Sequence, residues 1–178
     1  MAKTYIGIDS GKSGAIAILQ EGYPLRIEPM PLTGHKSKKT SVLDGYALKG
    51  LFRGLKVIGD IHVIAERPML MARRFKDKNG EEKSVGSNNM ASVSFKNAGF
   101  ILGLLVGLDI PYTEIRPTDW QRLMYAGEPK RDNKKDTSIA VAQRIFPDTT
   151  FMFPRGRVIN NNMTDAALIA EYGRRRNL

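Results

Sequence analysis

The sequence predicts an α/β fold in which a mixed five-stranded sheet is flanked by helices. Two observations predict it. Three β-favouring segments separated by short turns fill residues 4–30, which is typical of a three-stranded antiparallel meander. After them, segments with helical spacing alternate with two more short apolar segments, which indicates two parallel strands. We expect one domain over residues 1–178, because this length suffices for one core and is short for two.

The meander is predicted from alternation and from turn residues. Residues 4–9 alternate and favour β structure, the Ser- and Gly-rich residues 10–14 predict a tight turn, and residues 15–19 resume as a strand. A third strand is expected over residues 25–30, because prolines bracket it and a residue before proline avoids the helical region.

The middle of the chain predicts a helix, a strand and a loop. Apolar residues recur at helical spacing over residues 41–55, and Ser41 is the expected cap of this helix. Residues 62–66 predict a buried strand that ends before Pro68. The polar segment from residue 73 to residue 89 is expected to be a long exposed loop.

The remaining elements follow from the same reasoning. Residues 91–108 predict a helix in which Gly99, Gly103 and Gly107 would let another helix or a nucleic-acid backbone come close. Further expected elements are a strand over residues 111–116, a short helix opened by Pro117 with Thr118 as cap, and helices over residues 134–146 and 164–175.

The charge of the chain points to a polyanionic partner. The formal net charge is +10, from 28 Lys and Arg against 18 Asp and Glu. Nucleic acid is the leading partner class, although an anionic membrane surface would also suit a basic chain. The longest apolar run, residues 100–108, is well short of the ~20 residues needed to span a bilayer. With no Cys and no leader pattern before the first strand, we expect a soluble, intracellular protein.

Three acidic residues stand where the predicted fold brings chain segments together. Asp9 ends the first strand, Glu66 ends the fourth, and Asp165 opens the last helix. Strand ends and helix N-termini of an α/β sheet share a rim, so these side chains can converge. Clustered carboxylates need a cation, and hard oxygen ligands select Mg²⁺ or Mn²⁺. Two such ions can activate a water and stabilise the leaving oxygen of a phosphodiester, which predicts hydrolytic nuclease chemistry.

Each acidic residue also has a purely structural explanation. Asp9 precedes a turn and can act as an Asx-turn residue. Asp165 can be a helix-start charge favoured by the macrodipole. Glu66 follows the apolar residues 63–65 and either pairs with an adjacent cation such as Arg67 or serves a function. Taken singly, each of these explanations stays open.

Six short segments carry a resemblance to a known family. They are Ile6-Gly7-Ile8-Asp9-Ser10-Gly11, Ser13-Gly14-Ala15-Ile16-Ala17, Ile64-Ala65-Glu66-Arg67-Pro68, Arg116-Pro117-Thr118-Asp119-Trp120, Ile145-Phe146-Pro147 and Thr164-Asp165-Ala166-Ala167-Leu168-Ile169-Ala170. Together, and in this order across nearly the whole chain, they resemble the motifs of the RuvC-type Holliday junction resolvases. The segments that begin at Arg116 and Ile145 are similar to those of phage-type members.

The resemblance implies both fold and activity. The fold would be ribonuclease H-like, and the chain a homodimeric endonuclease that resolves four-way and related branched DNA junctions. The cofactor would be Mg²⁺, for which Mn²⁺ substitutes, with two ions per active site held by Asp9, Glu66, Asp165 and a fourth ligand. We expect no membrane partner and a cytoplasmic location, in the bacterial host if a phage encodes the chain.

The fourth ligand departs from the family pattern. The family has an acidic residue or histidine about one helical turn before the last Asp, and this position falls on Asn162 or, with a one-residue shift, on Asn161. Asn still offers a carbonyl oxygen to a metal, but the lost charge weakens the second ion. Native variation and an engineered change both stay open. The substitution also supports an alternative, a junction-binding protein of the same fold with weak or no catalysis.

The resemblance also implies where DNA is bound. An apolar or aromatic side chain can stack on an unpaired base while cations anchor phosphates. The alternatives are that the Met residues pack on the core and that the lysines are a solvated helix start. The expected DNA contacts are Lys12, Met69, Arg73, Arg74 and Phe75, with Lys130, Lys134 and Lys135 near the scissile phosphate.

A rival class shares the first motif. The phosphate loop of the actin and sugar-kinase ATPase superfamily also begins with an Asp-x-Gly turn, as Asp9-Ser10-Gly11 does. Those proteins need two such domains and a second phosphate loop. Because the sequence offers neither, we favour the nuclease.

Overall fold

A central sheet of five strands organises the molecule. The computed structural model describes residues 3–34, 41–69, 73–76, 82–85, 88–129, 134–153 and 156–178. The strand order is β3-β2-β1-β4-β7. Strand β1 (Thr4–Ile8) pairs antiparallel with β2 (Ala15–Gln20), which pairs antiparallel with β3 (Arg26–Pro29). On its other side β1 pairs parallel with β4 (Ile61–Glu66), and β4 pairs parallel with β7 (Tyr112–Ile115). The predicted mixed sheet of a meander plus two parallel strands is confirmed.

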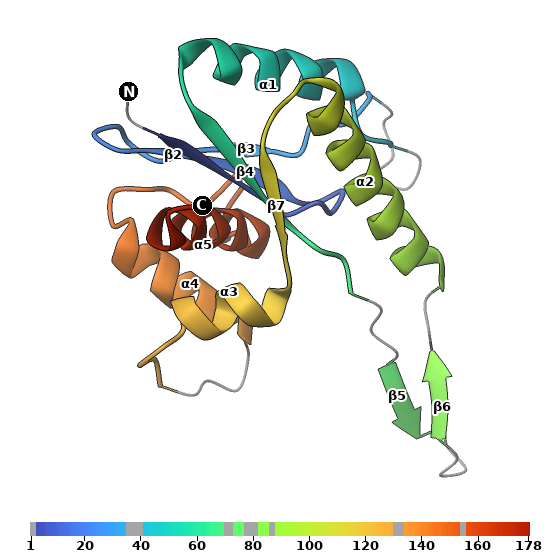
Figure 1. The fold of residues 1–178 in the computed structure, drawn as a ribbon. Helices are drawn as coiled ribbons and strands as arrows, with labels where there is room; N and C mark the ends of the chain where they lie inside the picture. The colour runs from blue at the N-terminus through green and yellow to red at the C-terminus, as the bar shows by residue number, and fades with distance from the viewer. Residues whose placement is uncertain are drawn as a thin grey trace.

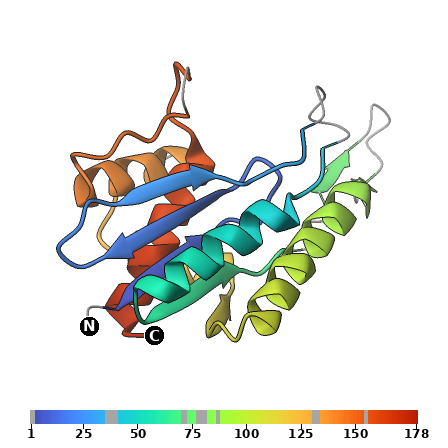
Figure 2. The same cartoon turned by 90° about the horizontal axis from the view of Figure 1, so that it is seen from above.

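Helices cover both faces of this sheet (Figure 1). Helices α1 (Gly45–Ile58) and α2 (Asn88–Gly107) lie side by side on one face, as Figure 2 shows from above. The other face carries α3 (Pro117–Met124), α4 (Lys134–Ile145) and α5 (Asn161–Arg176). In the part of the chain that the structure describes, none of these helices is long and apolar enough to cross a membrane.

Two separate cores follow from the period-2 alternation of the strands. Ile6 and Ile8 of β1 point to one face and pack with Phe52 of α1 and Leu105 of α2. Between them, Gly7 points to the opposite face, where α5 contributes more residues to the second core than any other described element. Strands β1, β2 and β4 are therefore largely buried on both faces, because helices cover both sides of the sheet.

Gly7 fixes the position of α5. A Cβ atom at residue 7 would lie 2.1 Å from the carbonyl oxygen of Ala166 and 2.4 Å from the amide nitrogen of Ala170. The backbone of α5 therefore rests directly on β1, which no larger residue at this position would allow. This close crossing brings the first turns of α5 to the end of β1.

Helix α1 begins later than the sequence predicted. The carboxylate of Asp44, and not the hydroxyl of Ser41, caps it by accepting hydrogen bonds from two amides of the first turn at 3.0 and 3.1 Å. The chain before Asp44 is still extended, because Leu43 forms a β-bridge with Leu32. The predicted cap at Ser41 was wrong for this reason.

The expected loop over residues 73–89 was also wrong. Strands β5 (Arg73–Lys76) and β6 (Glu82–Val85) form a two-stranded antiparallel sheet of their own, and α2 already begins at Asn88. Such a ladder pairs its backbone groups within the segment, so the apolar periodicity on which the prediction relied does not reveal it. Figure 1 shows this hairpin standing away from the central sheet, beyond the first turn of α2.

Two other helix starts differ from the expectation. Thr118 lies inside α3 and does not cap it, because Pro117 takes the first helical position and Arg116 becomes the N-cap residue. Helix α5 begins at Asn161 and not at residue 164, because the side chain of Asn160 accepts hydrogen bonds from the next helical amides.

The glycines of α2 line an open face of the helix. A Cβ atom at Gly99, Gly103 or Gly107 would have no atom within 4 Å. The expectation that these residues bring another helix close is therefore not met by any described element of the same chain.

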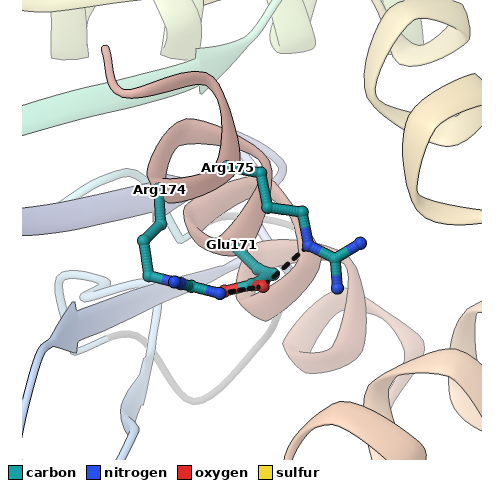
Figure 3. Close-up of polar contacts among 3 residues, drawn as sticks. All are labelled: Glu171, Arg174 and Arg175. Carbon is teal, nitrogen blue, oxygen red and sulfur yellow. Dashed lines mark hydrogen bonds and ion pairs between the residues drawn. The ribbon is translucent and has the colours of Figure 1, made fainter.

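A buried acid locks the last turn of α5 (Figure 3). Glu171 is 2% exposed and accepts hydrogen bonds from Arg174 at 2.7 Å and from Arg175 at 2.8 Å. Burial by itself would raise the pKa of Glu171, but these two charged donors bring it below its ordinary value. The arginines also suit the negative end of the helix dipole, so this cluster stabilises the end of α5.

Candidate active site

Three carboxylates converge at the carboxyl edge of the parallel strands. Asp9 directly follows β1, and Glu66 is the last residue of β4, whose register with β1 places Ala65 opposite Ile8. Asp165 lies in the second turn of α5, next to the residue of that helix that crosses Gly7. All three side chains are partly buried. The three side chains are close enough for the charges of Asp9 and Asp165 to raise the pKa of Glu66.

Glu66 is held by the single tryptophan of the chain. Its Oε1 accepts a hydrogen bond of 2.7 Å from Nε1 of Trp120, which is fully buried on α3. Burial raises the pKa of Glu66 to about 7, the Trp120 bond opposes this shift, and the charges of Asp9 and Asp165 add to it. Without a neutralising cation, Glu66 is therefore partly protonated at neutral pH.

Asp165 is held by a chain of hydroxyl groups. Its Oδ1 accepts a short hydrogen bond from Ser138 of α4, whose Oγ lies 2.8 Å from Oγ1 of Thr164. Burial raises the pKa of Asp165 to about 6, Ser138 opposes the shift, the charge of Asp9 adds to it, and Lys135 opposes it.

Tyr125 connects the two anchors. Burial and the charge of Asp165 raise the pKa of its hydroxyl, which also interacts with Ser138. Its ring meets Trp120 edge to face, with ring centroids 5.6 Å apart. The supports of Glu66 and Asp165 therefore form one connected structure.

Asp9 combines a turn role with the features of a site residue. Its Oδ1 accepts a hydrogen bond of 3.1 Å from the amide of Gly11, so the Asx-turn explanation is correct as far as it goes. Burial nevertheless raises the pKa of Asp9, and the Gly11 bond opposes the shift only in part. The turn closes tightly, because a Cβ atom at Gly14 would lie 2.0 Å from the Asp9 carbonyl oxygen.

The structural explanations for the other two carboxylates do not hold. Arg67 forms its ion pair with Glu114, at 3.8 Å, and the hydrogen-bond partner of Glu66 is Trp120. The helix dipole has its main effect in the first turn of α5, and Asp165 lies beyond that turn.

Three consecutive asparagines tie the start of α5 to its neighbours. Asn160 caps the helix, and Nδ2 of Asn161 donates to the carbonyl oxygen of Lys135 at 3.1 Å. Nδ2 of Asn162 donates to the carbonyl oxygen of Ser13, in the turn that follows Asp9. The amide oxygen of Asn162 is thus the atom left for a cation.

The chemical types of these ligand atoms suit a hard divalent cation, whereas the distances between the side chains are longer than a bound cation requires. Among the residues that the structure describes, no three acidic or histidine side chains lie close enough together to hold a metal ion. Three carboxylates and an amide oxygen are nonetheless the ligands that Mg²⁺ prefers. Burial is the main cause of the raised pKa values of Glu66 and Asp165, and neighbouring carboxylate charge adds to it, so a divalent cation between them would stabilise the ionised forms.

The predicted DNA contacts comprise the segment from Met69 to β5 and a set of lysines. Met69 is 48% exposed, so the alternative that it packs on the core was wrong. The backbone of Arg73, Arg74 and Phe75 forms β5 of the projecting hairpin.

Three of the four lysines predicted to contact DNA lie in described parts of the chain, and Lys135 is the one whose charge acts on a carboxylate of the site. Lys12 lies in the turn after Asp9, and Lys134 is the first residue of α4. Lys135 is exposed and close enough for its charge to lower the pKa of Asp165. Lys130 lies outside the described residues.

The sequence did not reveal the supporting residues. In the sequence Trp120 belongs to a motif, and its being the single tryptophan of the chain, in a short amphipathic helix, is the signal of its role. Ser138 and Tyr125 carry no signal in the sequence, because their contacts with the site arise from packing between helices.

Comparisons with solved structures agree with this architecture. The Thermus thermophilus RuvC structure aligns over 99% of this chain and 97% of its own, with a TM-score of 0.52 and 14% identity. T. thermophilus RuvC in complex with a Holliday junction substrate aligns over 99% and 96%, with a TM-score of 0.54 and 12% identity. No family model and no curated protein matches the sequence. The likeness shows the fold. It is ribonuclease H-like.

Proposed function

We propose that this chain is a structure-specific endonuclease that resolves four-way and related branched DNA junctions. The observation that carries the proposal is the placement of Asp9, Glu66 and Asp165 from three separate elements at one edge of the sheet, with pKa values raised mainly by burial and, for Glu66 and Asp165, also by neighbouring carboxylate charge. Perturbed carboxylates grouped at one edge of a sheet are a feature of functional sites. In this reading residues 1–178 form a single nuclease domain.

The ligands of the proposed metal site are Asp9, Glu66, Asp165 and the amide oxygen of Asn162. Two Mg²⁺ ions, or Mn²⁺ in their place, would supply an activated water and would stabilise the charge on the leaving oxygen. Trp120 and Ser138 hold one oxygen of Glu66 and one of Asp165, which orients the other oxygen of each carboxylate. In this role neither Trp120 nor Ser138 contacts the substrate.

The proposed substrate is supported by charge and by the solved neighbours. The net charge of +10 favours a polyanion, and one structural neighbour is a RuvC bound to a Holliday junction. A four-way junction has two sites for strand cleavage, so we propose a homodimer. We also propose a phage-type member acting in the cytoplasm of a bacterial host, on the motifs beginning at Arg116 and Ile145.

The proposed DNA-binding residues extend from the carboxylate edge to the hairpin. Exposed Met69 and the β5 residues Arg73, Arg74 and Phe75 would reach the crossover, where unpaired bases are available for stacking. Positive charge beside the carboxylates would hold the scissile strand. The residues proposed for this second role are Lys12, Lys130, Lys134 and Lys135.

Cleavage of a synthetic four-way junction tests the proposal. We expect paired nicks in the presence of Mg²⁺ or Mn²⁺, and a loss of at least about a hundredfold in the Glu66→Gln variant. Glu114→Gln is the matched control, because it removes the same charge from the neighbouring strand β7 at the Arg67 ion pair. Junction binding without cleavage by the wild-type chain in either metal would overturn the enzymatic part.

A junction-binding protein without catalysis is the second candidate. It is favoured by the structural use of both asparagines, since Asn161 and Asn162 each donate their amide nitrogen to a backbone carbonyl. The Asn162→Asp variant distinguishes the two candidates. If the wild-type chain binds without cutting and Asn162→Asp cuts, the asparagine is a disabling substitution. If neither cuts, the binding protein is the correct reading.

A further inference from the structure

A pocket lies beside the turn that follows Asp9, on the face of the sheet covered by α1 and α2. It encloses about 290 Å³. Apart from Lys12, none of its lining residues belongs to the candidate active site. The lining residues are Lys12, Val42 and Leu43, together with Val93, Lys96, Asn97 and Phe100 of α2.

One wall of this pocket is apolar and includes an aromatic ring. Val42 is 51% exposed and Phe100 is 44% exposed, so both present apolar surface that the core does not use. The ring of Phe100 lies against the start of α1. A Cβ atom at Gly45 would lie 2.7 Å from the Cζ atom of Phe100. A ring held by such a contact is a flat surface on which a base can stack.

Asn97 supplies an unused polar group at the same pocket. It is only 6% exposed, and its Nδ2 has no hydrogen-bond partner within the described part of the chain. A buried amide donor without an acceptor is destabilising, so a native structure rarely keeps one without a reason. Nδ2 is itself inaccessible, and a half-turn of the side-chain amide, which exchanges the positions of its nitrogen and its oxygen, would turn it toward an acceptor on the polar edge of a base.

Positive charge flanks the apolar wall. Lys96 is exposed on α2 directly before Asn97, and it forms no ion pair with another described residue. Lys12 stands on the other side, in the turn that also holds the Asp9 side chain through Gly11. The two lysines suit the phosphates on either side of a bound base.

We propose that this pocket binds one unpaired nucleotide of the DNA substrate. Its base stacks on Phe100 and pairs through a carbonyl group with Asn97, while its phosphates lie beside Lys12 and Lys96. The volume is at the lower end for ligand pockets and suits a single nucleotide, not a base pair. The inference rests on the proposed function, because the turn from Asp9 to Lys12 would carry the same strand past the carboxylates.

Binding of two short oligomers tests the inference in the absence of metal ions. Fluorescence anisotropy compares a labelled oligothymidine with an abasic oligomer of the same length, in EDTA. We expect the wild-type chain to prefer oligothymidine by about tenfold. Asn97→Leu keeps the size of the side chain and removes its amide, and Phe100→Leu removes the aromatic face. Each variant should reduce the preference to about twofold or less.

Two controls separate this role from a structural one. The melting temperature of Asn97→Leu should be equal to or above that of the wild type, because the unpartnered donor is gone. Lys96→Ala should weaken both oligomers equally, and by more than Arg53→Ala, which removes the same charge from an exposed position of α1 that does not line the pocket.

The outcomes of the two tests are independent. A wild-type chain without base preference, or a preference that survives in both Asn97→Leu and Phe100→Leu, overturns the inference even if the chain cuts junctions. Base preference that these variants abolish, in a chain that cuts no junction, leaves the pocket standing and overturns the proposed enzymatic function.

Discussion

The hydrogen bond between Trp120 and Glu66 is the most informative single contact of the site. It joins α3 to the end of β4 across 54 residues of sequence, and it provides the main opposition to the shift that burial imposes on Glu66. A metal ligand must be deprotonated to bind. The indole N–H therefore makes Glu66 available to a cation at lower pH than burial alone would allow.

Replacing Trp120 by Phe should move the pH dependence of cleavage. The variant keeps most of the buried aromatic surface and loses the donor, so the pKa of Glu66 should rise further above about 7. We expect the rising limb of the rate profile to move to higher pH, with roughly fivefold to tenfold less activity at pH 7. The measurement is the cleavage rate between pH 6 and pH 9 at fixed Mg²⁺. Equal loss at every pH would instead indicate damage to packing.

At the scale of elements, the packing of α5 on β1 determines whether the carboxylates meet. Gly7 allows the helix backbone to touch the strand, and that contact lies one residue from Asp165. The site therefore depends on the absence of a side chain at a position that carries no chemistry of its own.

Gly7→Ala should be strongly destabilising, whereas Gly50→Ala should not. The added methyl at residue 7 meets backbone atoms at 2.1 and 2.4 Å, which cannot move without displacing α5. We expect a loss of about 3 kcal/mol or more in the free energy of unfolding. A Cβ atom at Gly50 in α1 has no atom within 4 Å, so this control should gain about 0.5–1 kcal/mol. Urea unfolding followed by circular dichroism decides, and similar values for the two variants would contradict the argument.

The elements that could be predicted are those whose signal is local. The alternation of β1 and β2 and the apolar spacing of α2 and α5 are visible in single windows of sequence, and these elements were found with small errors at their ends. The cap at Asp44 could not be predicted, because it depends on the bridge between Leu43 and Leu32. The β5–β6 hairpin could not be predicted from apolar periodicity, because it forms no part of an apolar face of the central sheet.

At the scale of the whole molecule, the sheet order explains why the candidate site could be predicted in part. Adjacent parallel strands end at the same edge, so Asp9 and Glu66 had to be neighbours once β1 and β4 paired. The groups that hold the carboxylates could not be predicted, because Trp120 of α3 contacts the end of β4 and Ser138 of α4 contacts α5 only through tertiary packing.

The three carboxylates together should make the stability of the metal-free protein depend on pH. The folded-state pKa values of Glu66, about 7, and Asp165, about 6, lie above their ordinary values of 4.5 and 3.8, so the folded chain binds more protons than the unfolded chain between about pH 4 and pH 7. Stability should therefore fall as pH rises through this window, by at most about 3 kcal/mol for Glu66.

In EDTA we expect the melting temperature to decrease from pH 5 to pH 8. Glu66→Gln should flatten this dependence, and Glu114→Gln should leave it unchanged. Mg²⁺ at pH 8 should restore the lost stability, because a cation neutralises the repelling charges and binds only the folded chain. A melting temperature that rises from pH 5 to pH 8 in EDTA would contradict the raised pKa values of Glu66 and Asp165, and one that does not respond to Mg²⁺ at pH 8 would contradict a shared cation site.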